Sequence, residues 1–141
     1  MKVKMMGRLM AIDFGTKRTG LAVSDPLKII ATGLTTVETK NLIPFIENYL
    51  KTETIECFII GEPKTIFNEA SEITPKINAF IAKLKEKFPA IPIQRLDERF
   101  TSKIAQQTMI LGGLKKKDRQ NKGTVDMVSA TILLQDFMSM R

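Results

Sequence analysis

The chain has 141 residues, 43% of them hydrophobic and 26% charged, which suits one globular domain spanning residues 1–141. Lysine and arginine outnumber aspartate and glutamate by 22 to 15, so the net charge is +7 and the expected partner is a polyanion such as nucleic acid. No run approaches about 20 apolar residues, so no membrane span and no membrane partner are expected. The one cysteine, Cys57, lies in an apolar run and excludes an internal disulfide, which favours a cytoplasmic location.

The absence of histidine narrows the chemistry further. It excludes Ser-His and Cys-His nucleophile pairs and any histidine general base. With a single cysteine, a zinc site of the usual kind is excluded as well. Carboxylates, lysines and hydroxyls remain, and carboxylates suit hard cations such as Mg²⁺ or Mn²⁺.

The first third of the chain predicts an antiparallel meander. Residues 8–14 form an apolar run typical of a buried strand, and residues 18–24 predict a second strand that returns after the turn at Gly15. Asp25-Pro26 ends this strand, and residues 29–37 predict a third. Short connections between the three strands imply antiparallel pairing.

Strands and helices alternate from residue 41 onward. Apolar residues at helical spacing predict helices over 41–51 and 70–88, and apolar runs predict strands over 55–60 and 91–96. Pro92 places the last strand at the sheet edge or marks its start.

The last part of the chain predicts two more helices, over residues 101–111 and 124–138, separated by a basic mobile loop over 112–123. The expected fold class is therefore α/β. It has a mixed five-stranded sheet, with three antiparallel strands followed by parallel strands and helices on its faces.

Asp13 is the first candidate for chemistry. A carboxylate that ends an apolar strand is costly unless it is paired or bound to a cation. Gly15 and Gly20 follow it and allow a backbone or a phosphate to approach closely. The alternative is that Asp13 only caps the turn.

Two further acidic positions stand out. Asp97 and Glu98 follow a predicted strand, and strand ends of open α/β sheets are where metal and phosphate sites gather, although a solvated salt-bridging turn is the alternative. Asp126 precedes Ala130, Leu133 and Phe137 by four, seven and eleven residues, so it is expected on the helix face toward the sheet. The alternative for Asp126 is a favourable interaction with the helix dipole.

Four motifs carry a resemblance to a known family: AIDFGTKRTGLAVSD at 11–25, IIGEP at 59–63, LDERFTS at 96–102 and KGTVD at 122–126. The first also resembles the phosphate-binding hairpin of the actin and sugar-kinase superfamily, whose two domains need a longer chain. In order and spacing, the four together resemble the YqgF/RuvX family. That resemblance implies an RNase H-like fold related to RuvC Holliday-junction resolvases and a role in maturation of the 16S ribosomal RNA precursor.

The resemblance also implies a site. Asp13, Glu98 and Asp126 match the acidic positions of the family and are the expected catalytic residues and ligands of one or two Mg²⁺ or Mn²⁺ ions, with Asp97 a further candidate ligand. The chain departs from the family at Gly61-Glu62-Pro63, where Glu62 replaces an apolar residue; its role stays open between metal ligand and surface charge.

Basic residues beside these motifs are the expected phosphate contacts. They are Lys17, Arg18, Arg99, Lys115, Lys116, Lys117 and Lys122. The expected activity is cleavage of precursor 16S rRNA, with a ribosomal precursor particle as a further expected partner. Two alternatives stay open: a resolvase acting on branched DNA, which requires a homodimer, and a nucleic-acid-binding module without catalysis. The sequence does not choose between monomer and homodimer, or between RNA and DNA.

Overall fold

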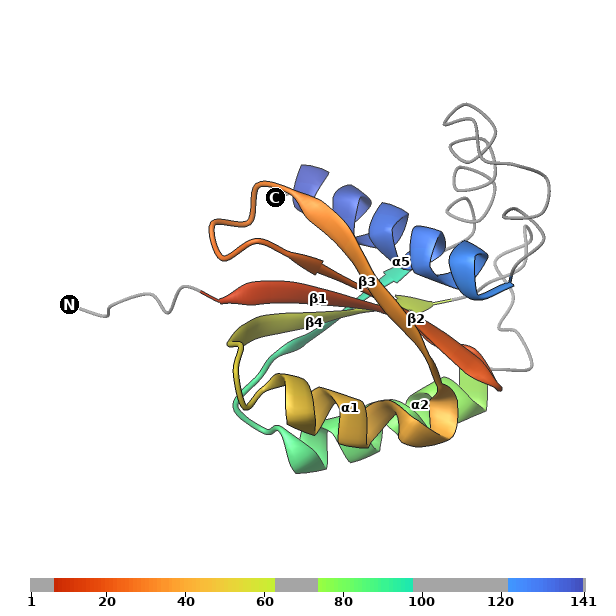
Figure 1. The fold of residues 1–141 in the computed structure, drawn as a ribbon. Helices are drawn as coiled ribbons and strands as arrows, with labels where there is room; N and C mark the ends of the chain where they lie inside the picture. The colour runs from red at the N-terminus through yellow and green to blue at the C-terminus, as the bar shows by residue number, and fades with distance from the viewer. Residues whose placement is uncertain (1–6, 63–73, 98–121, 141) are drawn as a thin grey trace.

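The computed structural model describes residues 7–62, 74–97 and 122–140. Its centre is one five-stranded sheet with the strand order β3-β2-β1-β4-β5 (Figure 1). The strands are β1 (Arg8–Asp13), β2 (Arg18–Ser24), β3 (Ala31–Glu38), β4 (Ile55–Glu62) and β5 (Ile93–Asp97). Pro92 directly precedes β5, which lies at the sheet edge as its proline predicted.

The pairing of the strands confirms the predicted mixed sheet. β1 pairs antiparallel with β2, and β2 with β3, whereas β4 lies parallel to β1 and to β5. The parallel pairs require crossovers, because a short turn cannot return a chain to the same starting edge. The crossover from β3 to β4 contains the 3₁₀ turn η1 (Thr39–Asn41) and the helix α1 (Leu42–Tyr49). The crossover from β4 to β5 contains the helix α2 (Thr74–Lys87).

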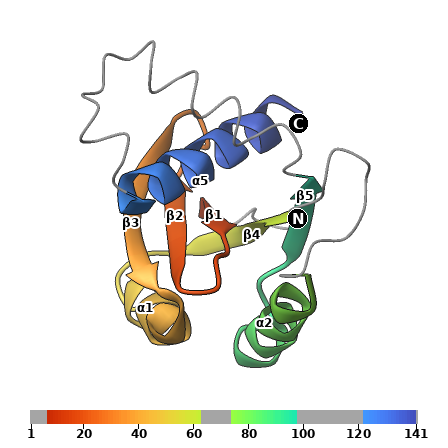
Figure 2. The same ribbon diagram turned by 90° about the vertical axis from the view of Figure 1, so that its right-hand side faces the viewer.

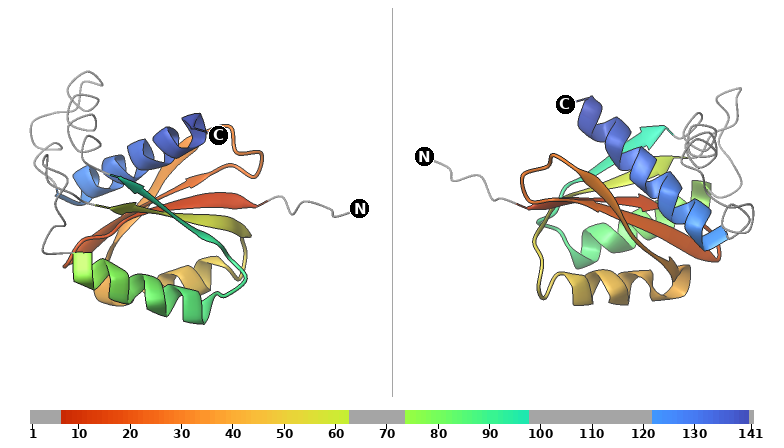
Figure 3. Two further views of the ribbon diagram at one scale, coloured as in Figure 1. Left: turned by 180° about the vertical axis from the view of Figure 1, so that it is seen from behind. Right: turned by 45° about the horizontal axis from the view of Figure 1, so that its top comes forward.

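Helices cover both faces of the sheet. α1 and α2 lie on one face, and α5 (Lys122–Ser139) crosses the other (Figures 1 and 3). Alternate residues of each strand therefore enter different cores. On the α1/α2 side the buried strand residues include Met10, Ile12, Phe58 and Ile60. On the α5 side they include Leu9, Ala11, Cys57 and Ile59.

Several predicted boundaries are wrong by about two residues: β4 ends at Glu62 rather than at residue 60, α1 ends at Tyr49 rather than at residue 51, and β5 begins at Ile93 rather than at residue 91. The third strand begins at Ala31 rather than at residue 29, because the backbone N–H groups of Ile29 and Ile30 donate to the Asp25 carboxylate, both at 2.7 Å, and so belong to a turn. Helix α5 begins at Lys122, so residues 122 and 123 are helical rather than part of the expected loop. The rest of that loop and the helix expected over 101–111 lie outside the described residues.

The buried position expected for Cys57 is confirmed, with 8% of its surface exposed. Among the described residues, no helix combines the length and the apolar character that crossing a membrane would require.

Candidate active site

The carboxyl ends of the three parallel strands meet at one edge of the sheet. Ile12 pairs with Ile60, so Asp13 is the next position on β1, and Glu62 pairs with Asp97 where β4 and β5 end. The first turns of α5 lie at the same end of the molecule as the carboxyl end of β1 (Figures 1 and 2). The backbone thus brings parts of all four motifs found in the sequence to one end of the molecule.

Asp13 lies half-buried at this edge. Leu9 and Ala11 face α5, so the strand alternation places Asp13 on the α5 side of the sheet. The next residue, Phe14, faces the other side and stacks on Phe80 of α2, with ring centroids 5.1 Å apart. This packing anchors the backbone beside Asp13, because the Phe14 ring cannot move without disturbing α2.

The turn after Asp13 requires glycine. A Cβ atom at Gly15 would lie 2.1 Å from the backbone oxygen of Arg18. The turn is also tied to η1, because the Thr39 hydroxyl donates to the Gly15 carbonyl oxygen at 2.6 Å and the Thr39 N–H donates to the Lys17 carbonyl oxygen at 2.9 Å. These bonds hold the backbone of the turn in one conformation.

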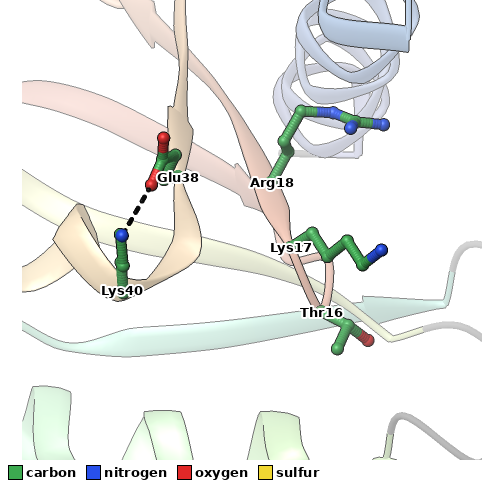
Figure 4. Close-up of a pocket in the computed structure, with 5 residues that line it drawn as sticks. All are labelled: Thr16, Lys17, Arg18, Glu38 and Lys40. Carbon is green, nitrogen blue, oxygen red and sulfur yellow. Dashed lines mark ion pairs between the residues drawn. The ribbon is translucent and has the colours of Figure 1, made fainter.

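Lys17 and Arg18 carry positive charge at the tip of this turn and at the start of β2. Together with Thr16, Glu38 and Lys40 they line an open hollow (Figure 4). Lys40 pairs with Glu38 at 3.2 Å, whereas Lys17 and Arg18 extend to the other side, away from this pair (Figure 4). Lys17 is exposed and Arg18 is half-buried, so both lie beside the turn where a phosphate could approach.

Helix α5 approaches the sheet closely at its N-terminal end. A Cβ atom at Gly33 of β3 would lie 2.9 Å from Cγ of Met127, so the missing side chain allows this approach. Ala130 and Leu133 are fully buried against the sheet, which confirms the expected sheet-facing stripe of the helix at these two positions.

Because α5 begins at Lys122, Asp126 lies beyond the first turn of the helix. The first turn itself contains no acidic residue. This disfavours the helix-dipole interpretation of Asp126, since that effect fades within the first turn. The side chain of Asp126 is not among the described ones.

Several predicted site residues lie outside the described part of the chain. Glu98, Arg99, Lys115, Lys116 and Lys117 are among them, as are the side chains of Glu62, Asp97 and Lys122. Within the described residues no group of three acidic or cysteine side chains is placed to hold a metal ion. The expected ligand set of Asp13, Glu98 and Asp126 therefore stays a prediction.

Sequence reasoning missed Thr39 and Lys40. Both lie beside the Gly15 turn, although more than 20 residues separate them from it along the chain. No local pattern indicates this proximity, since it arises only when β2 and β3 pair.

Comparison with known proteins identifies the family. The model of the RuvX family, described as Holliday junction resolvase, matches residues 7–140. The chain belongs to the RuvX family. Its mixed sheet with helices on both faces is consistent with the RNase H-like fold of that family.

Curated relatives of this RuvX-family chain cover nearly its whole length. A protein from Bacteroides fragilis is 55% identical over 133 residues, which are 94% of this chain and 96% of that protein. A protein from Christiangramia forsetii is 53% identical over 94% of this chain and 98% of its own length. A protein from Porphyromonas gingivalis is 50% identical over 94% of this chain and 96% of its own length. All three are named "Putative pre-16S rRNA nuclease". The family and these names support a nuclease role.

Proposed function

We propose that this chain is a metal-dependent endonuclease that hydrolyses phosphodiester bonds in the 16S rRNA precursor, in the cytoplasm, during ribosome biogenesis. The observation that carries this proposal is the half-buried Asp13 at the sheet edge where β4 and β5 also end in acidic residues. The substrate comes from the relatives, which are named for precursor 16S rRNA.

The residues at this edge fit a hard cation. Asp13, Glu98 and Asp126 are the proposed ligands of one or two Mg²⁺ or Mn²⁺ ions, with Asp97 as a further ligand. All supply carboxylate oxygens, the donors that these ions prefer. Carboxylates gathered at one place repel each other, and a bound cation relieves this repulsion. When bound, such an ion activates a water molecule and stabilises the leaving oxygen.

The other residues of the chain position the substrate. Gly15, two residues after Asp13, has no side chain that would keep a nucleic-acid backbone away from Asp13. Lys17 and Arg18 bind the phosphates that flank the cleaved bond. Further phosphate contacts come from Arg99, Lys115, Lys116, Lys117 and Lys122. These charges fix the register of the substrate without reading its sequence.

A second candidate function is cleavage of four-way DNA junctions, which the description of the family model favours. A resolvase cuts two symmetric strands, so this function requires a homodimer. The third possibility, a binding module without catalysis, predicts tight binding with no cutting of either substrate.

The test compares cleavage of RNA from the 5′ segment of the 16S precursor with cleavage of a four-way DNA junction, each in Mg²⁺, Mn²⁺ or EDTA. Asp13→Asn is the test variant. Asp136→Asn is the matched control, since Asp136 is also half-buried but lines a hollow with Met138 and Ser139 toward the C-terminal end of α5.

We expect metal-dependent RNA cutting by the wild type and by Asp136→Asn, and none by Asp13→Asn. Junction cutting alone, with a dimer in solution, would favour the resolvase. Salt-sensitive binding without cutting of either substrate would contradict the enzyme and leave the binding module.

A further inference from the structure

A basic groove lies between α1 and α2, on the side of the sheet opposite α5. Its floor contains Phe14, Ile43 and Phe80, and it encloses about 440 Å³. Three exposed lysines from η1 and α2 stand around it: Lys40, Lys76 and Lys83. We call this feature the lysine groove.

The lysine groove is continuous with the turn beside Asp13. It shares Thr16 and Lys40 with the hollow that Lys17 and Arg18 line. Figure 2 shows the β1–β2 turn between the ends of α1 and α2. A continuous basic path therefore runs from α2 to the tip of the hairpin.

In the other direction the groove continues along α2. A second hollow shares Lys40, Ile43 and Lys83 with it and reaches Lys87, so three lysines and one acidic residue, Glu86, line it. Lys76, Lys83 and Lys87 are spaced by seven and four residues, so they share one face of the helix. At 1.5 Å per residue, the eleven residues from Lys76 to Lys87 span roughly 16 Å, about the rise of five nucleotides in one strand.

The charge of the groove is only partly compensated. Lys40 pairs with Glu38 at 3.2 Å and Lys87 with Glu47 at 2.9 Å, and both pairs are exposed. Exposed pairs contribute little, so a phosphate can replace their carboxylates at low cost. In the part of the chain that the structure describes, Lys76 and Lys83 have no ion-pair partner.

We infer that the lysine groove binds the phosphodiester backbone of the nucleic-acid strand that leads to Asp13. The groove and Asp13 lie on opposite faces of the sheet, so the strand crosses the β1–β2 turn, where Lys17 and Arg18 continue the positive path. The claim that the strand leads to Asp13 rests on the proposed function, whereas the claim that a strand binds in the groove does not.

The experiment measures binding separately from cleavage, with Asp13→Asn as the background. Lys76→Gln and Lys83→Gln are combined, and the Kd for a fluorescent RNA stem-loop with a single-stranded tail is followed by anisotropy against salt concentration. Each phosphate of a single strand that a lysine no longer neutralises reduces the salt slope by about 0.7, so the pair reduces it by about 1.4. We expect Kd to rise roughly tenfold at about 0.1 M salt, with the same effect for DNA of the same sequence.

The matched control combines Lys51→Gln with Lys85→Gln, which removes the same charge. Both lysines are exposed, Lys85 is on α2, and neither lines the hollows of the groove. A control that binds like the parent protein supports the groove. Equal losses in the two pairs, or an unchanged salt slope in the groove pair, overturn it. Groove-dependent binding, together with a wild-type protein that cuts neither substrate in Mg²⁺ or Mn²⁺, would retain the groove and reject the proposed function.

Discussion

The hydroxyl oxygens of Thr19 and Thr39 lie 2.9 Å apart, beneath the turn that follows Asp13. The Thr39 hydroxyl donates its only proton to the Gly15 carbonyl oxygen at 2.6 Å, so the proton between the two threonines comes from Thr19. The Gly15 N–H in turn donates to the Thr19 oxygen in a long hydrogen bond of 3.5 Å. The three bonds form a ring that satisfies both backbone polar groups of Gly15.

Thr39→Val tests the importance of this ring. The change keeps the shape of the side chain but removes the acceptor for the proton of the Thr19 hydroxyl, which is fully buried, and the hydroxyl that donates to the Gly15 carbonyl. We expect the free energy of unfolding to fall by about 1–3 kcal/mol, measured by urea denaturation. Thr39→Ser should retain most of the stability, and Thr52→Val, at an exposed threonine, should change it by less than about 0.5 kcal/mol. A Thr39→Val protein as stable as the wild type would show that the ring contributes nothing.

Gly15→Ala tests the close approach within the turn. The added Cβ atom meets the backbone oxygen of Arg18 at 2.1 Å, and a backbone atom cannot turn away as a flexible side chain can. We expect a loss of roughly 1–3 kcal/mol in the free energy of unfolding and a loss of cleavage, because the backbone beside Asp13 must shift. Thr16→Ala, at an exposed position in the same turn, is the control. Full activity in Gly15→Ala would contradict a fixed turn.

Gly33→Ala tests the contact between β3 and the start of α5. The added Cβ atom would lie 2.9 Å from Cγ and 3.2 Å from Sδ of Met127, so the helix or the methionine must move. We expect Gly33→Ala to destabilise the wild type by about 1 kcal/mol and to cost less in a Met127→Ala background. A double-mutant cycle should give a coupling energy of at least about 0.5 kcal/mol, and additive effects would contradict the contact.

Asp25→Asn tests the turn before β3 through its pH dependence. Hydrogen bonds from the backbone N–H groups of Ile30, Ile29 and Leu27 hold the pKa of Asp25 below its ordinary value of 3.8. A lowered pKa contributes stability above the ordinary value, and that stability is lost as the pH falls through the pKa of the folded state. The difference in free energy of unfolding between wild type and Asp25→Asn should therefore shrink from about pH 5 to about pH 2.

Asp136→Asn should show a pH dependence of stability opposite in sign to that of Asp25→Asn. Burial raises the pKa of Asp136 above 3.8, so its ionisation in the folded state opposes stability as the pH rises. Relative to the wild type, Asp136→Asn should become more stable as the pH rises from about 2 to about 5. Parallel pH trends for the two variants would contradict at least one of the two assignments.

The order of strands and helices over the described residues could be predicted from the sequence, because hydrophobic periodicity directly reflects which face of an element is buried. The starts of β3 and α5 could not. Ile29 and Ile30 have the composition of a strand, but the Asp25 carboxylate takes their N–H groups. Side-chain bonds to the backbone of this kind compete with the sheet and leave no periodic signal.

The sequence by itself determined the family, the absence of histidine chemistry and the candidate Asp13, since motifs and residue types can be read without knowing any contact. Only the tertiary structure decided that Thr39 closes on the Gly15 turn and that Lys40 joins Lys76 and Lys83 around one groove. The reason is physical: these residues are distant along the chain and meet only because strand pairing and helix packing bring their elements together.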